Sequence, residues 1–331
     1  MPSANLLQRS MAEFSGGFVL AFHEISPQRL AGLVDGLQPF QAVHLSELVE
    51  RSKQRKSTSG LFAITVDDGV GENVRKLEQL FRVRGWPATF YIPTQYLDSG
   101  ESMVFQWWQW LKPLLPRRRL HLSSGVVDLS PPGAAQQLSR KMESLWHSQR
   151  LDSYLPVTME LVEIVLREGG LTRAVIQPAP PITWEEVAEL SKNDLIRFES
   201  HGVSHAAMSS LTDDELEFEM KHSRDLVTER TGRPCRHLAY PFGSWQSIGV
   251  RAVAAAERWY DSAVTMSLGP VDFANPWLLP RIPLYPENSA LVAQLKIFLK
   301  CNTLRPLKPE RAAAWKGNGL EQAGARSQDP G

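Results

Sequence analysis

The 331-residue sequence has few cysteines and no excess of either charge. Cys235 and Cys301 lie far apart and lack the spacing of a metal site, so they predict no disulfide framework and fit a reducing compartment. The 36 Lys and Arg residues balance 36 Asp and Glu residues. The net charge therefore gives no reason to expect nucleic acid or an anionic membrane as a partner.

The sequence also lacks long hydrophobic runs. No apolar stretch approaches the roughly 20 residues that a membrane-spanning helix needs, and residues 1–13 lack the basic-then-apolar order of a signal peptide. We therefore expect a cytoplasmic protein without an integral membrane segment. Hydrophobic residues make up 43% of the chain, enough for a large core within 1–304. The polar stretch 305–331, rich in glycine, alanine and proline, predicts a disordered tail.

An apolar run over 62–66 ends in Asp67, Asp68 and Gly69. The run predicts a strand buried on both faces, whose carboxyl end opens into a loop. Asp-Asp-Gly is common in turns, because Asp hydrogen-bonds to nearby backbone and Gly accepts a positive φ. However, two adjacent carboxylates repel each other unless a cation or a shared proton offsets one charge, so the alternative is a metal site.

A pair of histidines follows the strand predicted over 195–200. His201 and His205 are four residues apart, which would place both imidazoles on one face of a helical turn. This spacing is typical of zinc sites. His23 likewise follows a short apolar strand, predicted over 17–22. It is either a residue of a functional site or a structural residue that makes hydrogen bonds.

The alternation of strands and helices predicts the fold. Strand 62–66, helix 74–81 and strand 88–93 form a βαβ unit, which implies parallel pairing. About seven strands in all, separated mostly by helices, predict an α/β fold, a distorted (β/α) barrel with its polar strand ends at one rim. From about 100 to 181 the alternation lapses, which indicates a largely helical insertion. Its tryptophan-rich stretch 105–110 would either line a sugar-binding surface or pack against the barrel.

Three short motifs resemble those of a known family. Thr65–Gly69, His201–His205 and Ala239–Gly243, in this order, are similar to the first three motifs of the polysaccharide deacetylase family, the NodB-homology domain of carbohydrate esterase family four. The resemblance spans about residues 15–300. It implies a glycoside hydrolase/deacetylase β/α-barrel and metal-dependent removal of an acyl group, usually acetyl, from an N-acetylated sugar.

The resemblance also implies roles for individual residues. Asp67 would be the general base, and Asp68, His201 and His205 would hold a divalent ion, which we expect to be zinc. Two imidazoles and one carboxylate leave coordination positions open, so a water can bind and its pKa can fall toward neutrality. The backbone N–H of Phe242 would help to hold the tetrahedral oxyanion.

The sequence departs from the family pattern at two points. The third motif commonly has an arginine where this chain has Ala239, and we hypothesise that Arg281 supplies the missing cation that orients the base. The C-terminal Leu-x-His motif is not evident, so the general acid is unassigned, and His23 is a candidate by position. We expect His23, Tyr240 and Phe242 to contact the substrate.

These inferences predict a carbohydrate deacetylase, a hydrolase acting on carbon–nitrogen, non-peptide bonds. With a cytoplasmic location, its substrate would be an N-acetylated sugar of a glycan, a glycolipid or a nucleotide-linked precursor. Two alternatives remain at this point. One is a relative that hydrolyses a C–N bond outside sugars, and the other is a carbohydrate-binding protein that has lost catalysis.

Overall fold

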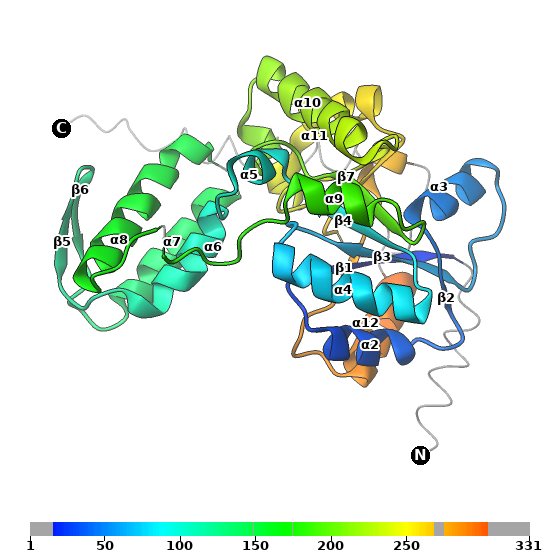
Figure 1. Ribbon diagram of the computed structural model, residues 1–331, viewed down its shortest axis with the longest axis horizontal. Coiled ribbons are helices and arrows are strands. Elements are labelled where there is room, and N and C mark those ends of the chain that lie inside the picture. Colours follow the sequence, from blue (N-terminus) through cyan, green and yellow to red (C-terminus); the bar gives the residue numbers. More distant parts are fainter. Residues whose placement is uncertain (1–15, 148, 174, 268–274, 304–331) are drawn as a thin grey trace, which may run out of the picture.

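The computed structural model describes residues 16–147, 149–173, 175–267 and 275–303. The stretch 305–331, for which the sequence predicts a disordered tail, lies outside the described residues. Within the described part, a curled parallel sheet is surrounded by helices, and a smaller lobe stands beside it (Figure 1).

The strands follow one another in the order β10-β1-β3-β4-β7-β8-β9, and every neighbouring pair is parallel. Their bounds are Phe18–Phe22 (β1), Leu61–Val66 (β3), Ala88–Ile92 (β4), Ile196–Ser200 (β7), His237–Ala239 (β8), Ser262–Val264 (β9) and Ile282–Pro283 (β10). A short strand that the sequence did not predict, β2 (Gln41–Ala42), pairs with β3. Because the strands are parallel, all their carboxyl ends lie at the same rim.

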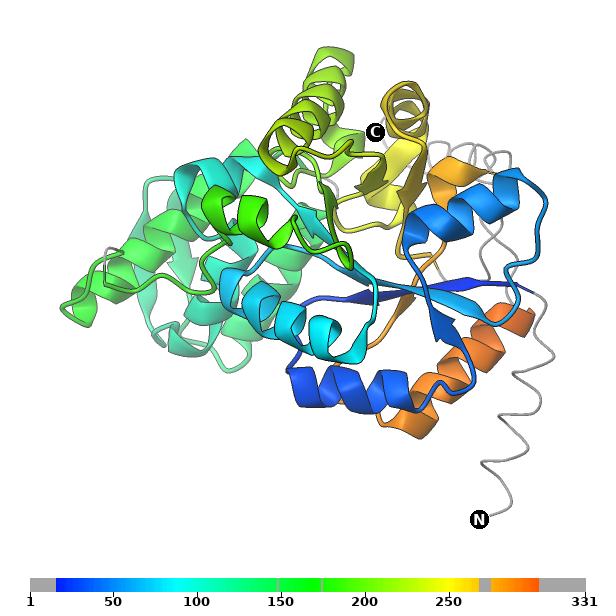
Figure 2. The ribbon, with the colours of Figure 1, turned by 45° about the vertical axis from the view of Figure 1, so that its right-hand side comes forward.

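One extended segment joins the two edges of this sheet. Leu279 bridges to Val264 of β9, and three residues later Ile282 pairs with Leu20 of β1. The sheet is therefore curled into a barrel, as the turned view shows (Figure 2). This arrangement confirms the predicted distorted (β/α) barrel of about seven strands.

Side chains alternate between the two faces of the sheet, as expected for strands with a period of two. Phe18 and Leu20 belong to the large core between the sheet and its helices. Val19, Ala63 and Tyr91 belong to a separate buried cluster, which we place on the opposite face because Val19 alternates with Phe18 and Leu20. The strand at 61–66 is buried on both faces, as the apolar run predicts.

The surrounding helices are α2 (Pro27–Asp35), α3 (Leu45–Lys53), α4 (Gly71–Arg84), α5 (Thr94–Ser99), α9 (Trp184–Leu190), α10 (Asp213–Thr231), α11 (Trp245–Trp259) and α12 (Ala290–Thr303). Helices α9 and α10 begin with capping boxes at Thr183 and Thr212. Gly85 and Gly232, each with a positive φ, end α4 and α10. None of the described helices is both long and apolar enough to span a bilayer.

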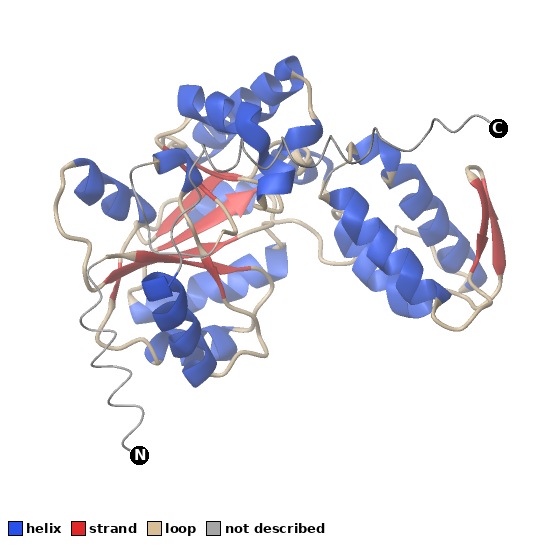
Figure 3. Cartoon of the chain, turned by 180° about the vertical axis from the view of Figure 1, so that it is seen from behind, coloured by secondary structure: helices blue, strands red, loops and turns tan. Residues whose placement is uncertain are grey.

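The lobe beside the barrel is formed by the insertion (Figure 3). It contains α6 (Val104–Leu111), η1 (Lys112–Leu114), β5 (Arg119–Leu122), β6 (Gly125–Asp128), α7 (Ala134–Trp146), η2 (Leu151–Ser153) and α8 (Leu155–Glu168). The antiparallel hairpin β5–β6 was not predicted. Trp107 and Trp108 are buried in the insertion's own core, so these two rings neither line a sugar-binding surface nor pack into the barrel core.

Candidate active site

Loops at the carboxyl ends of the strands meet around one cavity of about 250 Å³. The barrel contributes the polar residues predicted after β1, β3, β7 and β8, and the insertion contributes residues from α6 and the end of α7. The lining residues are His23, Asp67, Asp68, Phe105, Trp146, His147, His201, His205, Tyr240, Phe242 and Met266.

Asp68, His201 and His205 form a buried cluster of ligand type. Asp68 Oδ1 lies 3.7 Å from His201 Nε2 and 3.6 Å from His205 Nε2. One candidate ligand atom from each residue lies within 4.8 Å of the other two. Two imidazole nitrogens and one carboxylate oxygen are a donor set used by zinc in catalytic sites. The structure thus brings together the three residues expected to hold the metal.

Hydrogen bonding orients His201 for such a role. His201 Nδ1 lies 2.7 Å from the carbonyl oxygen of Ala239, to which it can only donate. The Nε2 atom, which faces Asp68, is then left with its lone pair. A ring N–H that donates to a carbonyl is the usual support for a metal-ligating histidine.

The prediction that His201 and His205 lie on a helical turn is wrong. Residues 201–207 form an irregular loop, in which Gly202 and His205 have φ values of 77° and 56°. The two rings nevertheless meet edge to face, with centroids 4.8 Å apart. Their proximity therefore comes from left-handed positions in a loop and not from the helical spacing.

The charges of the cluster favour a cation. Burial raises the pKa of the Asp68 carboxyl, since its negative charge has lost water. Burial, and then the neighbouring His201, lower the pKa of His205 well below its ordinary value, which favours the neutral imidazole. A divalent ion would stabilise the ionised Asp68 and needs neutral imidazoles as ligands. The residues present fit the expected ion.

Asp67 faces a different partner from Asp68. Arg281 Nη1 and Nη2 donate hydrogen bonds to the two Asp67 carboxylate oxygens, each over 2.7 Å. Arg281 also donates to Thr65 Oγ1 and to the carbonyl oxygen of Thr265. Burial opposes ionisation of Asp67, but the Arg281 guanidinium outweighs it and holds the pKa of Asp67 well below its usual range. Arg281 thus lies where the hypothesis of a replacement cation requires it.

Backbone strain is concentrated at this cavity. Three of the five non-glycine residues with a positive φ in the described part of the chain are Asp68 (76°), His205 (56°) and Phe242 (60°). Each such residue costs of order 1–3 kcal/mol. The surrounding structure therefore enforces these conformations at three of the residues predicted for the site.

Tyr240 and Phe242 lie where the sequence predicts them, in the cavity wall. The Tyr240 hydroxyl donates to the carbonyl oxygen of Trp277, so its polar group is already used within the protein. The Phe242 ring packs edge to face against His205, with centroids 4.8 Å apart. Its backbone N–H has no acceptor among the described residues.

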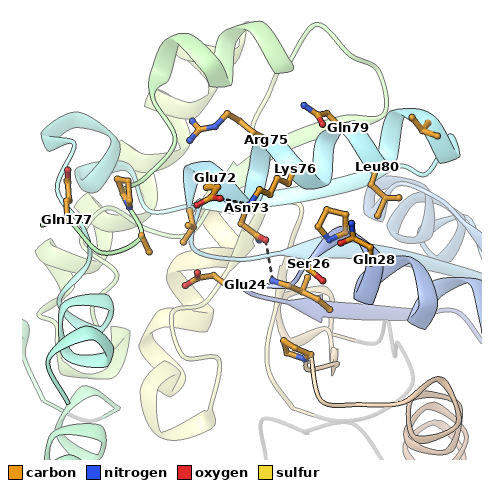
Figure 4. Close-up of a pocket in the computed structure, with 17 residues that line it drawn as sticks. Glu24, Ser26, Gln28, Glu72, Asn73, Arg75, Lys76, Gln79, Leu80 and Gln177 are labelled. Carbon is orange, nitrogen blue, oxygen red and sulfur yellow. Dashed lines mark hydrogen bonds and ion pairs between the residues drawn. The ribbon is translucent and has the colours of Figure 1, made fainter. Parts of the chain in front are cut away.

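His23 lies beside the predicted base. Its Nε2 is 4.0 Å from Asp67 Oδ2, and 43% of its side-chain surface is exposed. Asn73 holds the backbone of this loop, because Asn73 Nδ2 donates to the His23 carbonyl oxygen. Asn73 Oδ1 also accepts from the Ile25 N–H (Figure 4). The histidine therefore has a fixed backbone and a side chain that solvent can reach.

A larger cavity, of about 1190 Å³, lies on the flank of the barrel between α2, α4 and the end of the insertion (Figure 4). Its cations are already paired: Arg75 binds Glu186 and Lys76 binds Glu72. It contains none of the predicted catalytic or ligand residues, so we assign the chemistry to the smaller cavity.

Comparison with known proteins agrees with the motifs. A model of the polysaccharide deacetylase family matches residues 151–258, a stretch that contains both His201–His205 and Ala239–Gly243. Residues 151–258 of the chain are thus similar to the polysaccharide deacetylase family. The match does not extend to Asp67 and Asp68, whose place in the site comes from the structure. A comparison with curated protein sequences finds no match.

Solved structures of deacetylases share the fold. The Streptococcus pyogenes deacetylase PplD, in complex with acetate, matches with a TM-score of 0.57 at 14% sequence identity, over 85% of this chain and 98% of that one. A de-N-acetylase from Aggregatibacter actinomycetemcomitans matches with a TM-score of 0.54 at 12% identity, over 85% and 99% of the two chains. The BpsB deacetylase domain from Bordetella bronchiseptica matches with a TM-score of 0.53 at 14% identity, over 82% and 97%.

One further residue shapes the loop that contains His201 and His205. Glu219, on α10, accepts hydrogen bonds from the backbone N–H groups of Val203 (2.6 Å) and Ser204 (3.1 Å) and from the Ser204 hydroxyl. We did not predict this role. The sequence holds a weak signal for it, because Glu219 falls on the apolar face of α10, next to Met220 and three residues after Leu216.

The insertion residues at the cavity were also not predicted. Phe105 packs against His205 with ring centroids 5.3 Å apart, and His147 packs against Phe242 at 5.0 Å. Within the tryptophan-rich stretch, Phe105 is the residue that lines the cavity.

Proposed function

We propose that this protein is a metal-dependent hydrolase that removes an acyl group from a sugar of a glycan, a glycolipid or a nucleotide-linked precursor. The acyl group that we favour is N-acetyl. The observation that carries the proposal is the buried Asp68–His201–His205 cluster next to an Asp67 carboxylate fixed by Arg281, all in one cavity. The deacetylase names of the structural relatives support the same reaction class.

In this proposal Asp68, His201 and His205 hold a divalent ion, and the donor set favours zinc. When bound, the ion would supply Lewis acidity that polarises the acyl carbonyl and lowers the pKa of the attacking water. Asp67 accepts the proton of that water. Arg281 keeps Asp67 ionised and holds both of its oxygens, so the carboxylate has one fixed orientation.

Collapse of the tetrahedral intermediate breaks the C–N bond, and the leaving nitrogen needs a proton. We propose that His23 donates it, because His23 Nε2 lies 4.0 Å from Asp67 Oδ2 and its side chain lines the cavity. The backbone N–H of Phe242, which has no acceptor among the described residues, would stabilise negative charge on the acyl oxygen.

The test is acetate release from N-acetylhexosamine glycans, glycolipid precursors and nucleotide-linked sugars. Purified protein is assayed untreated, after chelation and after zinc is added back. His201→Ala serves as the inactive variant and His222→Ala, an exposed histidine on α10, as the matched control. We expect release that chelation and His201→Ala abolish, that zinc restores to the wild type, and that His222→Ala leaves unchanged.

Other outcomes would redirect the proposal. Stoichiometric metal without acetate release would indicate a different C–N substrate, and small ureides and imides would be assayed next. No release together with no bound metal would favour a non-catalytic carbohydrate-binding relative. The role of His23 has its own test: a pH–rate profile of His23→Gln that keeps the basic limb of the wild-type profile would contradict it. The cytoplasmic location stays a prediction.

A further inference from the structure

Two phenylalanine rings in the smaller cavity pack against one of the residues expected to hold the metal. The Phe105 ring contacts the His205 imidazole with centroids 5.3 Å apart, and the Phe242 ring contacts the same imidazole at 4.8 Å. Both phenylalanines line the cavity. His205 Nε2 itself lies 3.6 Å from Asp68 Oδ1. The polar cluster therefore has an apolar corner directly beside one of its imidazoles.

Phe105 comes from the insertion, which holds it in a fixed position. It is the second residue of α6, and this helix begins with a capping box in which Gln106 Oε1 accepts a hydrogen bond from the Met103 N–H over 3.0 Å. Phe105 also packs against the insertion's core, to which Trp107 and Trp108 belong. Those two tryptophans are fully buried, whereas Phe105 is only half-buried. Phe105 therefore presents open apolar surface to the cavity from a rigid support.

We propose that Phe105 limits the length of the acyl chain, so that the cavity accepts N-acetyl and rejects N-acyl groups that are two or more carbons longer. This inference rests on the proposed function, in which the acyl carbonyl reacts at the Asp68–His201–His205 cluster. The substituent on the carbonyl carbon then lies beside His205, where the two rings pack. A methyl group there covers apolar ring surface, which is favourable in water. A longer chain would have to displace a ring.

The size of the cavity supports selection at the acyl end. Its volume of about 250 Å³ lies below the range of about 300–1,000 Å³ that is usual for small-molecule sites. The cavity therefore encloses the acyl end of the substrate, and the rest of the sugar extends beyond it. A closely packed wall does not yield easily to extra methylene groups.

Of the two rings, Phe105 is the one that can be changed without touching the groups of the proposed reaction. Phe242 has a φ of 60°, and its backbone N–H is the donor proposed for the acyl oxygen. A substitution at Phe242 would therefore alter the reaction as well as the cavity. Phe105 has no part in the proposed reaction, so its substitution tests the wall alone.

The test compares acyl chains of different length on one sugar. The N-acetylated substrate is assayed beside its N-propionyl and N-butyryl analogues. We expect kcat/KM of the wild type to fall at least about 10-fold from N-acetyl to N-butyryl, because a hydrophobic pocket discriminates one methylene by about 10- to 200-fold. Phe105→Ala should raise the N-butyryl to N-acetyl ratio of kcat/KM at least about 10-fold. Phe218→Ala, which removes a ring that is 54% exposed on α10 and does not line the cavity, should leave the ratio unchanged.

The ratio does not depend on how much of each protein is active, because both substrates meet the same enzyme molecules. Phe105→Leu, which also shortens the side chain, replaces Phe105→Ala if the alanine variant does not fold. A second readout needs no turnover: the affinities for acetate and butyrate, the carboxylate products, are measured by calorimetry. The Phe105 variant should bind butyrate, relative to acetate, at least about 3-fold more tightly than the wild type does.

Two results overturn the inference. One is an N-butyryl to N-acetyl ratio that is the same in the wild type and in a folded Phe105 variant, and the other is a wild type that hydrolyses N-butyryl as fast as N-acetyl. A wild type that releases no acyl group from any of the sugars would instead overturn the proposed function. The relative affinities for acetate and butyrate would then still decide whether Phe105 limits the acyl chain.

Discussion

Arg281 and Asp67 form a buried ion pair with two parallel hydrogen bonds, each 2.7 Å long. Arg281 belongs to the segment that bridges the edges of the barrel, and Asp67 follows the strand β3. The same contact therefore connects the closing segment to the predicted base. Both side chains are almost completely inaccessible to water, at 0% and 2% exposure. Removing either partner would leave a buried charge without compensation.

We expect Arg281→Ala to lose both stability and activity. An unpaired buried charge costs about 3–5 kcal/mol of unfolding free energy, and the freed Asp67 would lose its fixed orientation, lowering kcat at least about 100-fold. Arg251→Ala is the control, because Arg251 pairs with Asp213 on the surface, where an ion pair is worth about 1 kcal/mol or less. Urea denaturation and acetate release measure the two effects. A folded Arg281→Ala with wild-type turnover would rule out the role assigned to this residue.

Much of the site follows from local sequence patterns. Asp67 and Asp68 end an apolar run, and His201 follows another, so parallel pairing is enough to bring them to one rim. The role of Arg281 follows from the missing cation at Ala239 and from its position at the end of the last strand that the sequence predicts. Such inferences succeed because strand order and direction determine which end of each strand meets the others.

The remainder depends on contacts that local patterns do not encode. The loop from His201 to His205 has left-handed residues, and its backbone is held by Glu219, 14 residues after His205. Trp146 reaches the cavity because the insertion is placed against the barrel by contacts such as Arg150 with Glu215. Neither relationship has a characteristic spacing, so the sequence predicts the ligands better than it predicts their supports.

Glu219 offers a test of one such support. We expect Glu219→Gln to weaken metal binding about 10- to 100-fold, because its amide NH₂ group would face the N–H donors of Val203 and Ser204 that the carboxylate now accepts from. Chelator competition for zinc measures the affinity. Glu217→Gln, a surface change on the same helix next to Arg258, should bind zinc like the wild type. Equal zinc affinity in Glu219→Gln and the wild type would show that the loop holds its shape without this carboxylate.

Gly243 is expected to be far less replaceable than another glycine of similar backbone conformation. Gly243 and Gly232 have φ values of 61° and 66°. A Cβ at Gly243 would lie 2.6 Å from the Met266 backbone nitrogen, whereas a Cβ at Gly232 would meet nothing within 4 Å. Gly232→Ala should cost about 1–2 kcal/mol for the left-handed conformation. Gly243→Ala adds a clash of about 1–3 kcal/mol and displaces the neighbouring Phe242.

The two alanine variants are compared by urea denaturation and by zinc affinity. The prediction requires Gly243→Ala to be the less stable variant and Gly232→Ala to keep its zinc affinity. Equal losses of stability would mean that the backbone around Met266 yields to the added methyl group.

His237 provides a stability effect that is separate from the catalytic cluster. It is buried in β8, where its Nδ1 lies 2.9 Å from Ser262 Oγ and its Nε2 has no partner among the described residues. Burial, with a smaller contribution from Arg236, lowers the pKa of His237 from 6.5 to about 3. Between these two values the unfolded chain binds a proton that the folded protein does not, so stability is lost as the pH falls through this window.

We expect the wild type to lose about 2 kcal/mol more unfolding free energy than His237→Gln when the pH is lowered from 7 to 5, because glutamine has no proton to gain. Urea denaturation of both proteins at pH 5, 6 and 7, with the metal removed, measures the difference. Every other titrating group is common to the two proteins, so its contribution cancels in the comparison. A constant stability difference across the three pH values would mean that His237 has the same proton affinity in the folded and unfolded chain.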